Sequence, residues 1–290
     1  MVRQDRNDST TQTLVTAHYG RHGDLRTRIR DAVQTLGGDP ERPDYETLHP
    51  LDQFHLGGPA ATRGLAEFAG LSDAGLSGQQ VLDVGCGIGG PARCLAREFG
   101  GQVTGIDLTE SYVRDARHLS AWVGLDTATR FVCASALDLP LADGTWPVVW
   151  SQHTIMNIPD KRRFYAEIAR VLAPGGVFVH HDIIAGPMRE PHFPLPWASE
   201  PAASFLLPGR DIHAAIAGAG LAETAWRDIT ADALASLREA RGARARGEPE
   251  APGPQLILGP EFLDMRANLA RNLEEGRLGV IQGLWHKPAA

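Results

Sequence analysis

The segment from Val81 to Gly90 limits the possible folds of this chain more than any other part of the sequence. Its first four residues form an apolar run typical of a buried strand, glycines fill four of its last six positions, and a helical pattern begins at Pro91. Glycines allow a tight turn and let a ligand come close to the backbone. The segment therefore predicts a strand, a ligand-binding turn and a helix in succession.

Strand and helix patterns continue to alternate after this turn. Apolar residues at helical spacing separate most of the predicted strands. This rhythm predicts an α/β fold with a doubly wound, mostly parallel sheet, because a helical crossover is the usual connection between parallel strands. The predicted strands are 81–84, 102–106, 130–134, 146–150, 177–179, 221–229 and 279–285.

We divide the chain into four parts. Residues 1–70 are expected to form an arm and lid helices, and residues 71–230 the ligand-binding core. The core includes a loop, 187–208, whose six prolines predict an extended path. Residues 231–278 are an insert or cap with a Pro- and Gly-rich stretch that is expected to be exposed and mobile, and residues 279–290 return to the sheet as its final strand.

Composition excludes several classes of protein. The formal charge of −7 disfavours a general affinity for nucleic acid. Three cysteines without paired spacing do not form a disulfide or zinc pattern, so we predict no bound metal. The first ten residues contain no apolar leader and no stretch is apolar enough to span a membrane, so we expect a cytoplasmic protein without a membrane partner.

The glycines alone leave two nucleotide cofactors open. Gly85, Gly87 and Gly90 satisfy the G-x-G-x-x-G pattern of dinucleotide-binding folds. Asp107, at the end of the second predicted strand, can accept both ribose hydroxyls, but NAD and S-adenosylmethionine share that requirement. Asp83 discriminates between them, because a carboxylate there suits the ammonium group of an amino acid and offers nothing to a pyrophosphate.

Four motifs in sequence order resemble those of class I methyltransferases. The resemblance runs from about residue 81 to residue 179 and implies a seven-stranded Rossmann-like sheet with an antiparallel final strand near 280–285, a helical lid and bound S-adenosylmethionine. The chain is similar to the small-molecule branch, which includes sarcosine/dimethylglycine, quinone, tocopherol and natural-product methyltransferases. The motifs are 83–90, 105–109, 135–140 and 170–176.

The resemblance also implies a set of cofactor-binding residues on these motifs and at the end of the fourth strand. They are Asp83, Gly85, Cys86, Gly87, Asp107, Leu108, Ser135, Ala136, Gln152 and His153. The chain departs from the family at Ser135, where an acidic residue usually contacts the adenine amino group. That contact then passes to the serine hydroxyl, to water or to Asp138.

Three residues are candidates for a catalytic base. His153 and His181 follow the fourth and fifth predicted strands, whose carboxyl ends border the ligand in such sheets. Glu167 shares an apolar helix face, where burial would raise the pKa of its carboxyl group. The alternatives are simple packing for the histidines and an arginine ion pair for Glu167. His180, His181 and Asp182 do not predict a metal site, because neighbouring strand residues point to opposite faces.

Five residues are expected to bind the acceptor. Phe54 and His55 precede the core, where related enzymes place a lid, and Phe193, Trp197 and Phe205 make the proline-rich loop aromatic. An aromatic wall favours an apolar or aromatic acceptor. A small charged amine such as dimethylglycine would instead depend on a cation, Arg189 or Arg210, near the ends of this loop.

The sequence thus predicts transfer of a methyl group from S-adenosylmethionine to nitrogen, oxygen or carbon of a small, apolar or aromatic molecule, with S-adenosylhomocysteine as product. The alternative is a protein that binds the cofactor but uses it as a scaffold for another reaction or for an interaction, since binding does not establish transfer. Copies of the chain are expected to associate into a homo-oligomer through the N-terminal helices.

Overall fold

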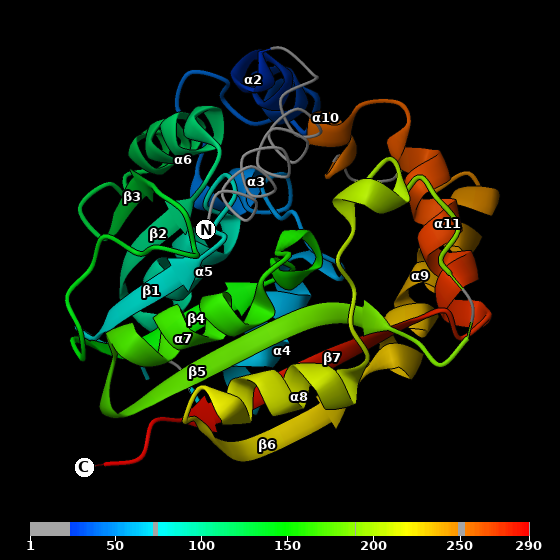
Figure 1. Ribbon diagram of the computed structural model, residues 1–290. Helices are drawn as coiled ribbons and strands as arrows, with labels where there is room; N and C mark the ends of the chain where they lie inside the picture. The colour runs from blue at the N-terminus through cyan, green and yellow to red at the C-terminus, as the bar shows by residue number, and fades with distance from the viewer. Residues whose placement is uncertain (1–23, 72–74, 189, 249–252, 290) are drawn as a thin grey trace.

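The computed structural model describes residues 24–71, 75–188, 190–248 and 253–289. A single twisted sheet runs through this part of the chain, with helices on both faces (Figure 1). The strands are β1 (Gln80–Val84), β2 (Gln102–Asp107), β3 (Thr129–Cys133), β4 (Trp146–Gln152), β5 (Leu172–Ala185), β6 (Ala222–Asp228) and β7 (Leu278–His286). The helices are α2 (Leu25–Thr35), α3 (Tyr45–Leu48), α4 (Gly58–Phe68), α5 (Gly90–Phe99), α6 (Glu110–Trp122), α7 (Lys161–Val171), α8 (Gly209–Gly218), α9 (Thr230–Ala245), α10 (Gln255–Leu258) and α11 (Phe262–Glu274), with short 3₁₀ turns η1 (Ile155–Asn157) and η2 (Pro201–Ala203).

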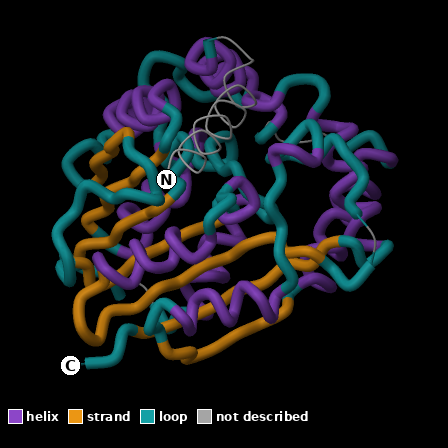
Figure 2. The backbone as a smooth tube through the Cα atoms, viewed as in Figure 1, coloured by secondary structure: helices purple, strands orange, loops and turns teal. Residues whose placement is uncertain are grey.

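The seven strands are ordered β3-β2-β1-β4-β5-β7-β6, and Figure 2 shows them as one continuous sheet. Strands β1 to β5 pair in parallel, whereas β7 runs antiparallel to both β5 and β6. The predicted α/β class, doubly wound order and antiparallel final strand are therefore confirmed. No helix in the described ranges is long and apolar enough to cross a membrane.

Two apolar layers cover the sheet because neighbouring strand residues point to opposite faces. Val81 of β1 belongs to the layer formed with α4, α5 and α6. Leu82 and Val84 belong to the opposite layer, which includes α7, α8, and parts of α9 and α11. Alternation along β1 thus contributes side chains to both layers. Because β1, β2 and β4 run parallel, their carboxyl ends lie at one edge of the sheet.

Strand β5 is much longer than the predicted 177–179. It pairs with β7 from Val177 opposite His286 to Ala185 opposite Leu278, so β7 supplies hydrogen-bond partners well beyond the predicted end of the strand. His181 was predicted to follow the strand, but it lies inside it. His180 and His181 point to opposite faces, which agrees with the expectation that they do not converge on a metal.

Helices α9 and α11 of the insert pack against each other beyond the end of β5 (Figure 1). Leu237 of α9 and Leu269 of α11 are buried in the main core, which holds this part of the insert against the sheet. Residues 249–252, within the stretch predicted to be mobile, lie outside the described residues. The insert therefore contributes folded helices to the molecule.

Candidate active site

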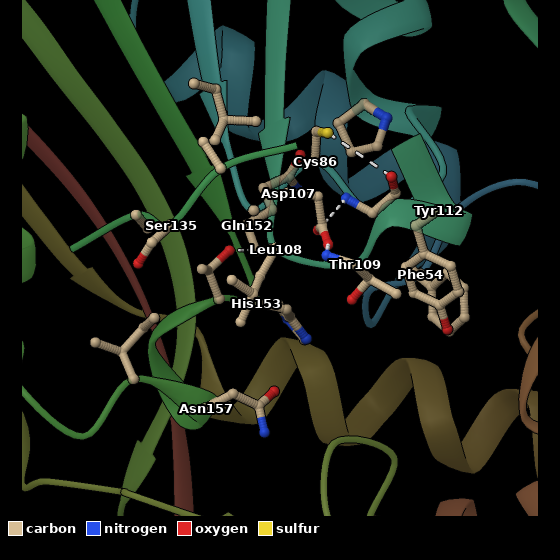
Figure 3. A pocket seen from close by; sticks show the side chains of 18 of the residues that line it. Phe54, Cys86, Asp107, Leu108, Thr109, Tyr112, Ser135, Gln152, His153 and Asn157 are labelled. Atoms are coloured by element: carbon tan, nitrogen blue, oxygen red, sulfur yellow. Dashed lines mark hydrogen bonds between the residues drawn. The ribbon is translucent and has the colours of Figure 1, made fainter. Parts of the chain in front are cut away.

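A cavity opens at the carboxyl ends of β1, β2 and β4 (Figure 3). The turn after β1 forms one wall, the end of β2 a second, and the segment after β3 a third. The residues that line it are Asp52, Phe54, His55, Gly85, Cys86, Gly87, Pro91, Ile106, Asp107, Leu108, Thr109, Tyr112, Ala134, Ser135, Ala136, Leu137, Gln152, His153, Thr154, Asn157, Ile158 and Pro159. We call this space the first cavity.

Two glycines of the turn after β1 lie so close to other segments of the chain that a side chain would not fit there. Gly85 has a φ of +82°, and a Cβ there would lie 2.1 Å from Oγ1 of Thr154. A Cβ at Gly90 would lie 2.3 Å from the carbonyl oxygen of Asp52, in the segment that covers the turn. The glycines therefore serve the fit between the turn and the chain around it as well as the approach of a ligand.

Asp107 holds the turn in place from the end of β2. Its Oδ2 accepts a hydrogen bond from the Gly87 N–H at 2.9 Å, and its Oδ1 accepts one from the Thr109 N–H at 2.8 Å. Burial raises the pKa of this carboxyl group, and the two backbone hydrogen bonds oppose that effect. Each carboxylate oxygen keeps a lone pair that can accept a ligand hydroxyl.

Asp83 lies behind the first cavity and does not line it. Its side chain is buried, and Oδ2 finds no hydrogen-bond partner among the described residues. Burial raises the pKa of this carboxyl group to about 8, and the negative charge of Asp107 adds to the effect. A cationic group bound near Asp83 would lower this raised pKa again. Asp83 was predicted to bind the cofactor, but its side chain is not among those that line the first cavity.

We expect Asp83→Asn to change how stability depends on pH. The folded carboxyl group keeps its proton up to about pH 8, whereas the unfolded one loses it near 3.8, so this group destabilises the parent increasingly as pH rises between those values. The stability of the variant relative to the parent should therefore grow from pH 4 to pH 8, measured by urea denaturation at each pH. A constant difference across this range would show that Asp83 is ionised or solvated in the folded chain.

The wall after β3 fits the predicted role of Ser135 and Ala136 better than that of Asp138. Ser135 lines the cavity and its Oγ accepts a hydrogen bond from the Leu137 N–H at 3.2 Å. The Asp138 side chain is 89% exposed and faces Arg163. Of the two side chains considered for the adenine contact, Ser135 lines the cavity and Asp138 does not.

Among the residues that line the cavity without having been predicted are Thr109, Tyr112, Thr154 and Asn157. Thr109 directly precedes α6 and Tyr112 lies in its first turn, so their distance of two and five residues from Asp107 is the signal that identifies them. Thr154 and Asn157 follow His153 in the same way. Their positions depend on the 3₁₀ turn η1, which no periodic pattern in the sequence predicts.

A second cavity adjoins the first and shares Phe54, His55 and His153 with it. It is lined by apolar side chains from the segment before α4, from the proline-rich loop and from the insert. The remaining lining residues are Pro50, Gln53, Leu56, Gly57, Gly58, Met156, Ile183, Pro196, Trp197, Ser236, Leu237, Ala240, Pro254, Gln255, Leu258, Phe262, Arg266 and Leu269.

Only part of the predicted aromatic wall reaches the second cavity. Trp197 lines it, but Phe193 and Phe205 do not, and Phe193 packs against the main core. The Phe205 N–H donates to the Met156 carbonyl, and the Phe205 carbonyl accepts from Lys161 Nζ at 2.7 Å. The prediction for Phe193 and Phe205 was therefore wrong, and Leu237 and Phe262 of the insert form the wall in their place.

His153 stands where the two cavities meet, and its backbone is unusual. Its φ is +53°, which is uncommon outside glycine, and its N–H donates to the carbonyl of His181 at 2.8 Å. The His153 ring contacts the His181 ring edge-on with centroids 4.8 Å apart. Burial lowers the pKa of both imidazoles, to about 3 for His181, so both are neutral at neutral pH.

His181 lines neither the first nor the second cavity. It could influence a ligand there only indirectly, through its contact with His153. Glu167 is not part of either cavity. Its carboxylate accepts from Arg170 Nη2 at 2.7 Å and from the Leu139 N–H at 2.8 Å, and the Arg170 hydrogen bond lowers its pKa. The expectation of a raised pKa for Glu167 was wrong, and its alternative, an ion pair with an arginine, is confirmed, because the Arg170 guanidinium stabilises the ionised form.

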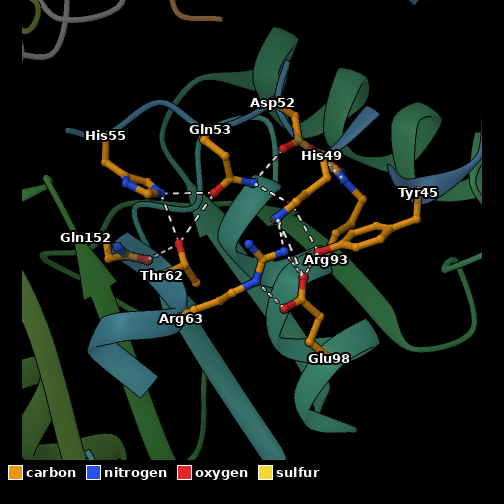
Figure 4. Close-up of polar contacts among 10 residues, drawn as sticks. All are labelled: Tyr45, His49, Asp52, Gln53, His55, Thr62, Arg63, Arg93, Glu98 and Gln152. Atoms are coloured by element: carbon orange, nitrogen blue, oxygen red, sulfur yellow. Dashed lines mark hydrogen bonds and ion pairs between the residues drawn. The ribbon is translucent and has the colours of Figure 1, made fainter. Parts of the chain in front are cut away.

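A polar network fixes the segment before α4 over the glycine turn (Figure 4). Asp52 and Arg93 form an ion pair at 2.8 Å in which both side chains are fully buried. His55 Nε2 lies 3.0 Å from Gln53 Oε1 and 3.1 Å from Thr62 Oγ1, and Thr62 donates to Gln152 Oε1 at 3.1 Å. The network therefore connects the predicted lid residue His55 to the end of β4.

His49, Cys94 and Glu98 lie close enough together to resemble a metal site. The Arg63 guanidinium, however, donates to His49 Nε2 at 3.0 Å and to both Glu98 oxygens at 2.6 and 2.8 Å. The positive charge that a metal ion would supply is thus already present. This cluster is best explained as part of the polar network that attaches the N-terminal segment to α5.

Comparison with known proteins identifies the kind of domain that contains the first cavity. Residues 82–180 match the family model described as a methyltransferase domain. The chain contains a methyltransferase domain. The match covers the turn after β1, the end of β2, the segment after β3 and the end of β4, which are the elements that build the first cavity.

Curated relatives are similar to less than half of this chain. Tocopherol O-methyltransferase of Arabidopsis thaliana is 40% identical over 126 residues, which are 41% of this chain and 36% of that protein. Methyltransferase GfsG of Streptomyces halstedii is 35% identical over 142 residues, 49% of each chain. The chain thus spans about a third to a half of the length of these relatives.

Solved structures resemble the fold over a longer stretch. Geranyl diphosphate C-methyltransferase from Streptomyces coelicolor superposes with a TM-score of 0.69 over 96% of this chain and 98% of its own, at 20% identity. The [4+2]-cyclase SpnF superposes with a TM-score of 0.61 over 80% and 82%, at 24% identity. These likenesses establish a shared Rossmann-like methyltransferase fold.

Proposed function

We propose that this chain is an S-adenosylmethionine-dependent methyltransferase that acts on a small molecule. The observation that supports this most is the pairing of two cavities that share Phe54, His55 and His153. The first lies within the methyltransferase domain at the carboxyl ends of the strands, where ligands of such sheets bind. The second cavity is mainly apolar and would hold the acceptor next to the first cavity.

The residues of the first cavity fit the proposed cofactor. Asp107 keeps acceptor capacity for ribose hydroxyls, and the backbone at Gly85 and Gly87 can be approached closely. Gln152 lines this cavity with an Nε2 that is buried without a partner among the described residues, so it can donate to a ligand carboxylate or carbonyl. Asp83, behind the turn, would provide negative charge toward a bound ammonium group, since that cation would lower its raised pKa.

When bound, S-adenosylmethionine supplies a methyl group on an electrophilic sulfonium. The chain aligns the acceptor and excludes water, which is the main requirement of an in-line displacement. His55 and His153 border both cavities and are kept neutral by burial, so either can accept a proton from the acceptor. Leu237, Leu258 and Phe262 favour an apolar or aromatic acceptor.

Release of S-adenosylhomocysteine from a panel of phenols, isoprenoids and amines tests this proposal. Turnover with an apolar or aromatic member supports methyl transfer, and the product identifies the methylated atom. Binding of S-adenosylmethionine without turnover on any acceptor would favour the scaffold alternative. A cytoplasmic location, the absence of a nucleic-acid partner and association through the N-terminal helices also stay predictions.

Trp197→Ala should weaken use of the acceptor without affecting the cofactor. Loss of apolar contact in such a pocket lowers kcat/KM by about 10- to 200-fold, and Trp197 does not line the first cavity. The matched control is Arg210→Ala, since Arg210 is 84% exposed and lines neither cavity. Arg189, the other cation considered for a charged amine, lies outside the described residues.

Because Trp197 is also buried in the core, its variant should be assayed well below its unfolding temperature. Unchanged acceptor kinetics in Trp197→Ala would place the acceptor elsewhere. A loss confined to Arg210→Ala would instead support a charged acceptor held near α8.

A further inference from the structure

A third cavity, of about 250 Å³, lies behind the candidate active site. Small residues of α4 form one wall, and polar side chains from β5, β6, β7 and α9 form the other. The polar lining residues are His181, Arg227, Asp232, Ser236 and Gln282. This cavity differs from the second one, whose walls are mainly apolar, and the mechanism described so far makes no use of it.

Two of these polar groups are buried without partners. His181 is 2% exposed and neither ring nitrogen has a hydrogen-bond partner among the described residues; Gln282 is 5% exposed and its Oε1 has none there. The two residues are neighbours across β5 and β7, so they share one face of the sheet. Buried polar groups without partners are costly, and a cavity of this size exceeds what a water molecule needs. The third cavity therefore has the room and the polar groups that ordered water requires.

His181 also connects this cavity to the active site. Its ring contacts the ring of His153, which lines both other cavities, and its carbonyl accepts the His153 N–H. Asp232 is exposed and brings the third cavity to the surface of the molecule, and the exposed Ser236 lines both the second and the third cavity. The path runs from the reaction centre through two adjacent imidazoles to solvent.

His55 belongs to a separate polar network, which reaches the partly exposed Glu98 only through the longer series of Gln53 and His49. It is the other histidine that borders both active-site cavities, but its Nε2 contacts Gln53 and Thr62. From there the polar network continues to the Asp52–Arg93 ion pair, whose side chains are fully buried. A proton that enters this network reaches no exposed group of the pair.

The proposed reaction makes a proton that has to leave. In transfer from a sulfonium to an acceptor X–H, the S–CH₃ bond breaks with its electron pair remaining on sulfur, and a lone pair of X forms the X–CH₃ bond. Sulfur becomes neutral, so the positive charge ends on the proton that X loses. Mostly apolar walls solvate such a charge poorly.

We propose that His181 relays this proton from His153 to water in the third cavity, which is thereby the proton exit of the active site. The proposal rests on the proposed function. Both imidazoles are neutral before turnover, which leaves each with a nitrogen able to accept the proton. Their contact is edge-on, so transfer needs a turn of one ring or one water between them. His55, His180, Arg227 and Asp232 are other ionisable groups near this path.

Hydrogen–deuterium exchange at the C2 position of histidine rings tests the exit without any ligand. Gly64→Leu should fill the third cavity, because Gly64 lines it and an added Cβ meets no atom within 4 Å. We expect exchange at His181, followed by mass spectrometry on the full chain, to slow at least about tenfold, as it would if access required an opening that costs about 1.4 kcal/mol.

Gly218→Leu is the matched control, since Gly218 is also helical, has the same free space and lines none of the three cavities. It should leave the exchange rate at His181 unchanged. Equal rates in the parent and in Gly64→Leu would mean that His181 has no contact with solvent through this cavity and would overturn the proposal.

Kinetics test the relay itself. With the acceptor that gives turnover, His181→Phe should lower kcat about 100-fold, the scale of a lost general acid–base group, and should enlarge the solvent deuterium isotope effect. The dissociation constant of S-adenosylhomocysteine should not change. Unchanged kcat and isotope effect would overturn the relay. Failure of the parent to bind S-adenosylhomocysteine would instead overturn the proposed function, which the exchange experiment does not measure.

Discussion

Asp52→Ala is expected to lower the free energy of unfolding by about 3 to 5 kcal/mol, because it leaves the Arg93 guanidinium buried without its counter-charge. Both side chains of the pair are fully buried. Arg93 would retain hydrogen bonds to the Ile88 carbonyl and to Ser120 Oγ, but these carry no full negative charge. Urea denaturation followed by circular dichroism measures the loss.

Two further variants separate the buried charge from general effects of substitution. Arg210→Ala breaks an exposed ion pair and should cost less than about 1 kcal/mol. The double variant Asp52→Leu with Arg93→Met removes both charges and should regain much of the stability lost in Asp52→Ala. A loss below 1 kcal/mol in Asp52→Ala would mean that the segment before α4 is not held by this pair.

Asp107→Ala should weaken binding of S-adenosylhomocysteine by roughly 100-fold or more, since each hydrogen bond to a charged group contributes about 1.5–3 kcal/mol. The variant loses the acceptors for ribose hydroxyls and also those for the Gly87 and Thr109 N–H groups. Because Asp107 supports the turn as well as the ligand, some loss of stability should accompany the loss of affinity, whereas the sequence suggested a role for the ligand alone.

Titration calorimetry measures this effect, with Asp138→Ala as the control. Asp138 follows β3 in the same domain, but its side chain is 89% exposed and lines neither active-site cavity. Its replacement should leave the affinity as it is in the parent. Equal affinity in Asp107→Ala and the parent would remove Asp107 from the cofactor site.

The parts of the fold and site that the sequence predicted depend on local patterns. The turn after β1, the strands of the core and the position of Asp107 follow from apolar runs and glycines close together in the chain. The carboxyl ends of parallel strands then meet at one edge, so Gly85, Asp107 and His153 line one cavity although they are far apart in sequence.

The parts that the sequence did not predict depend on how distant segments pack. Asp52 and Arg93 are 41 residues apart, and no single-chain pattern pairs them. Phe193 and Phe205 belong to an aromatic loop, but aromatic content does not determine which side of the loop faces a cavity. Glu167 has an apolar helix face around it, and only the position of Arg170 one turn later settles that it is ionised.

The measurement that tests the central claim most directly is calorimetric titration of the full chain with S-adenosylhomocysteine and, in parallel, with NAD. We predict one S-adenosylhomocysteine per chain and no binding of NAD. At 100 times the dissociation constant, S-adenosylhomocysteine should stabilise the fold by about 2.7 kcal/mol, visible as a higher melting temperature. Binding of NAD with no response to S-adenosylhomocysteine would contradict the proposed function.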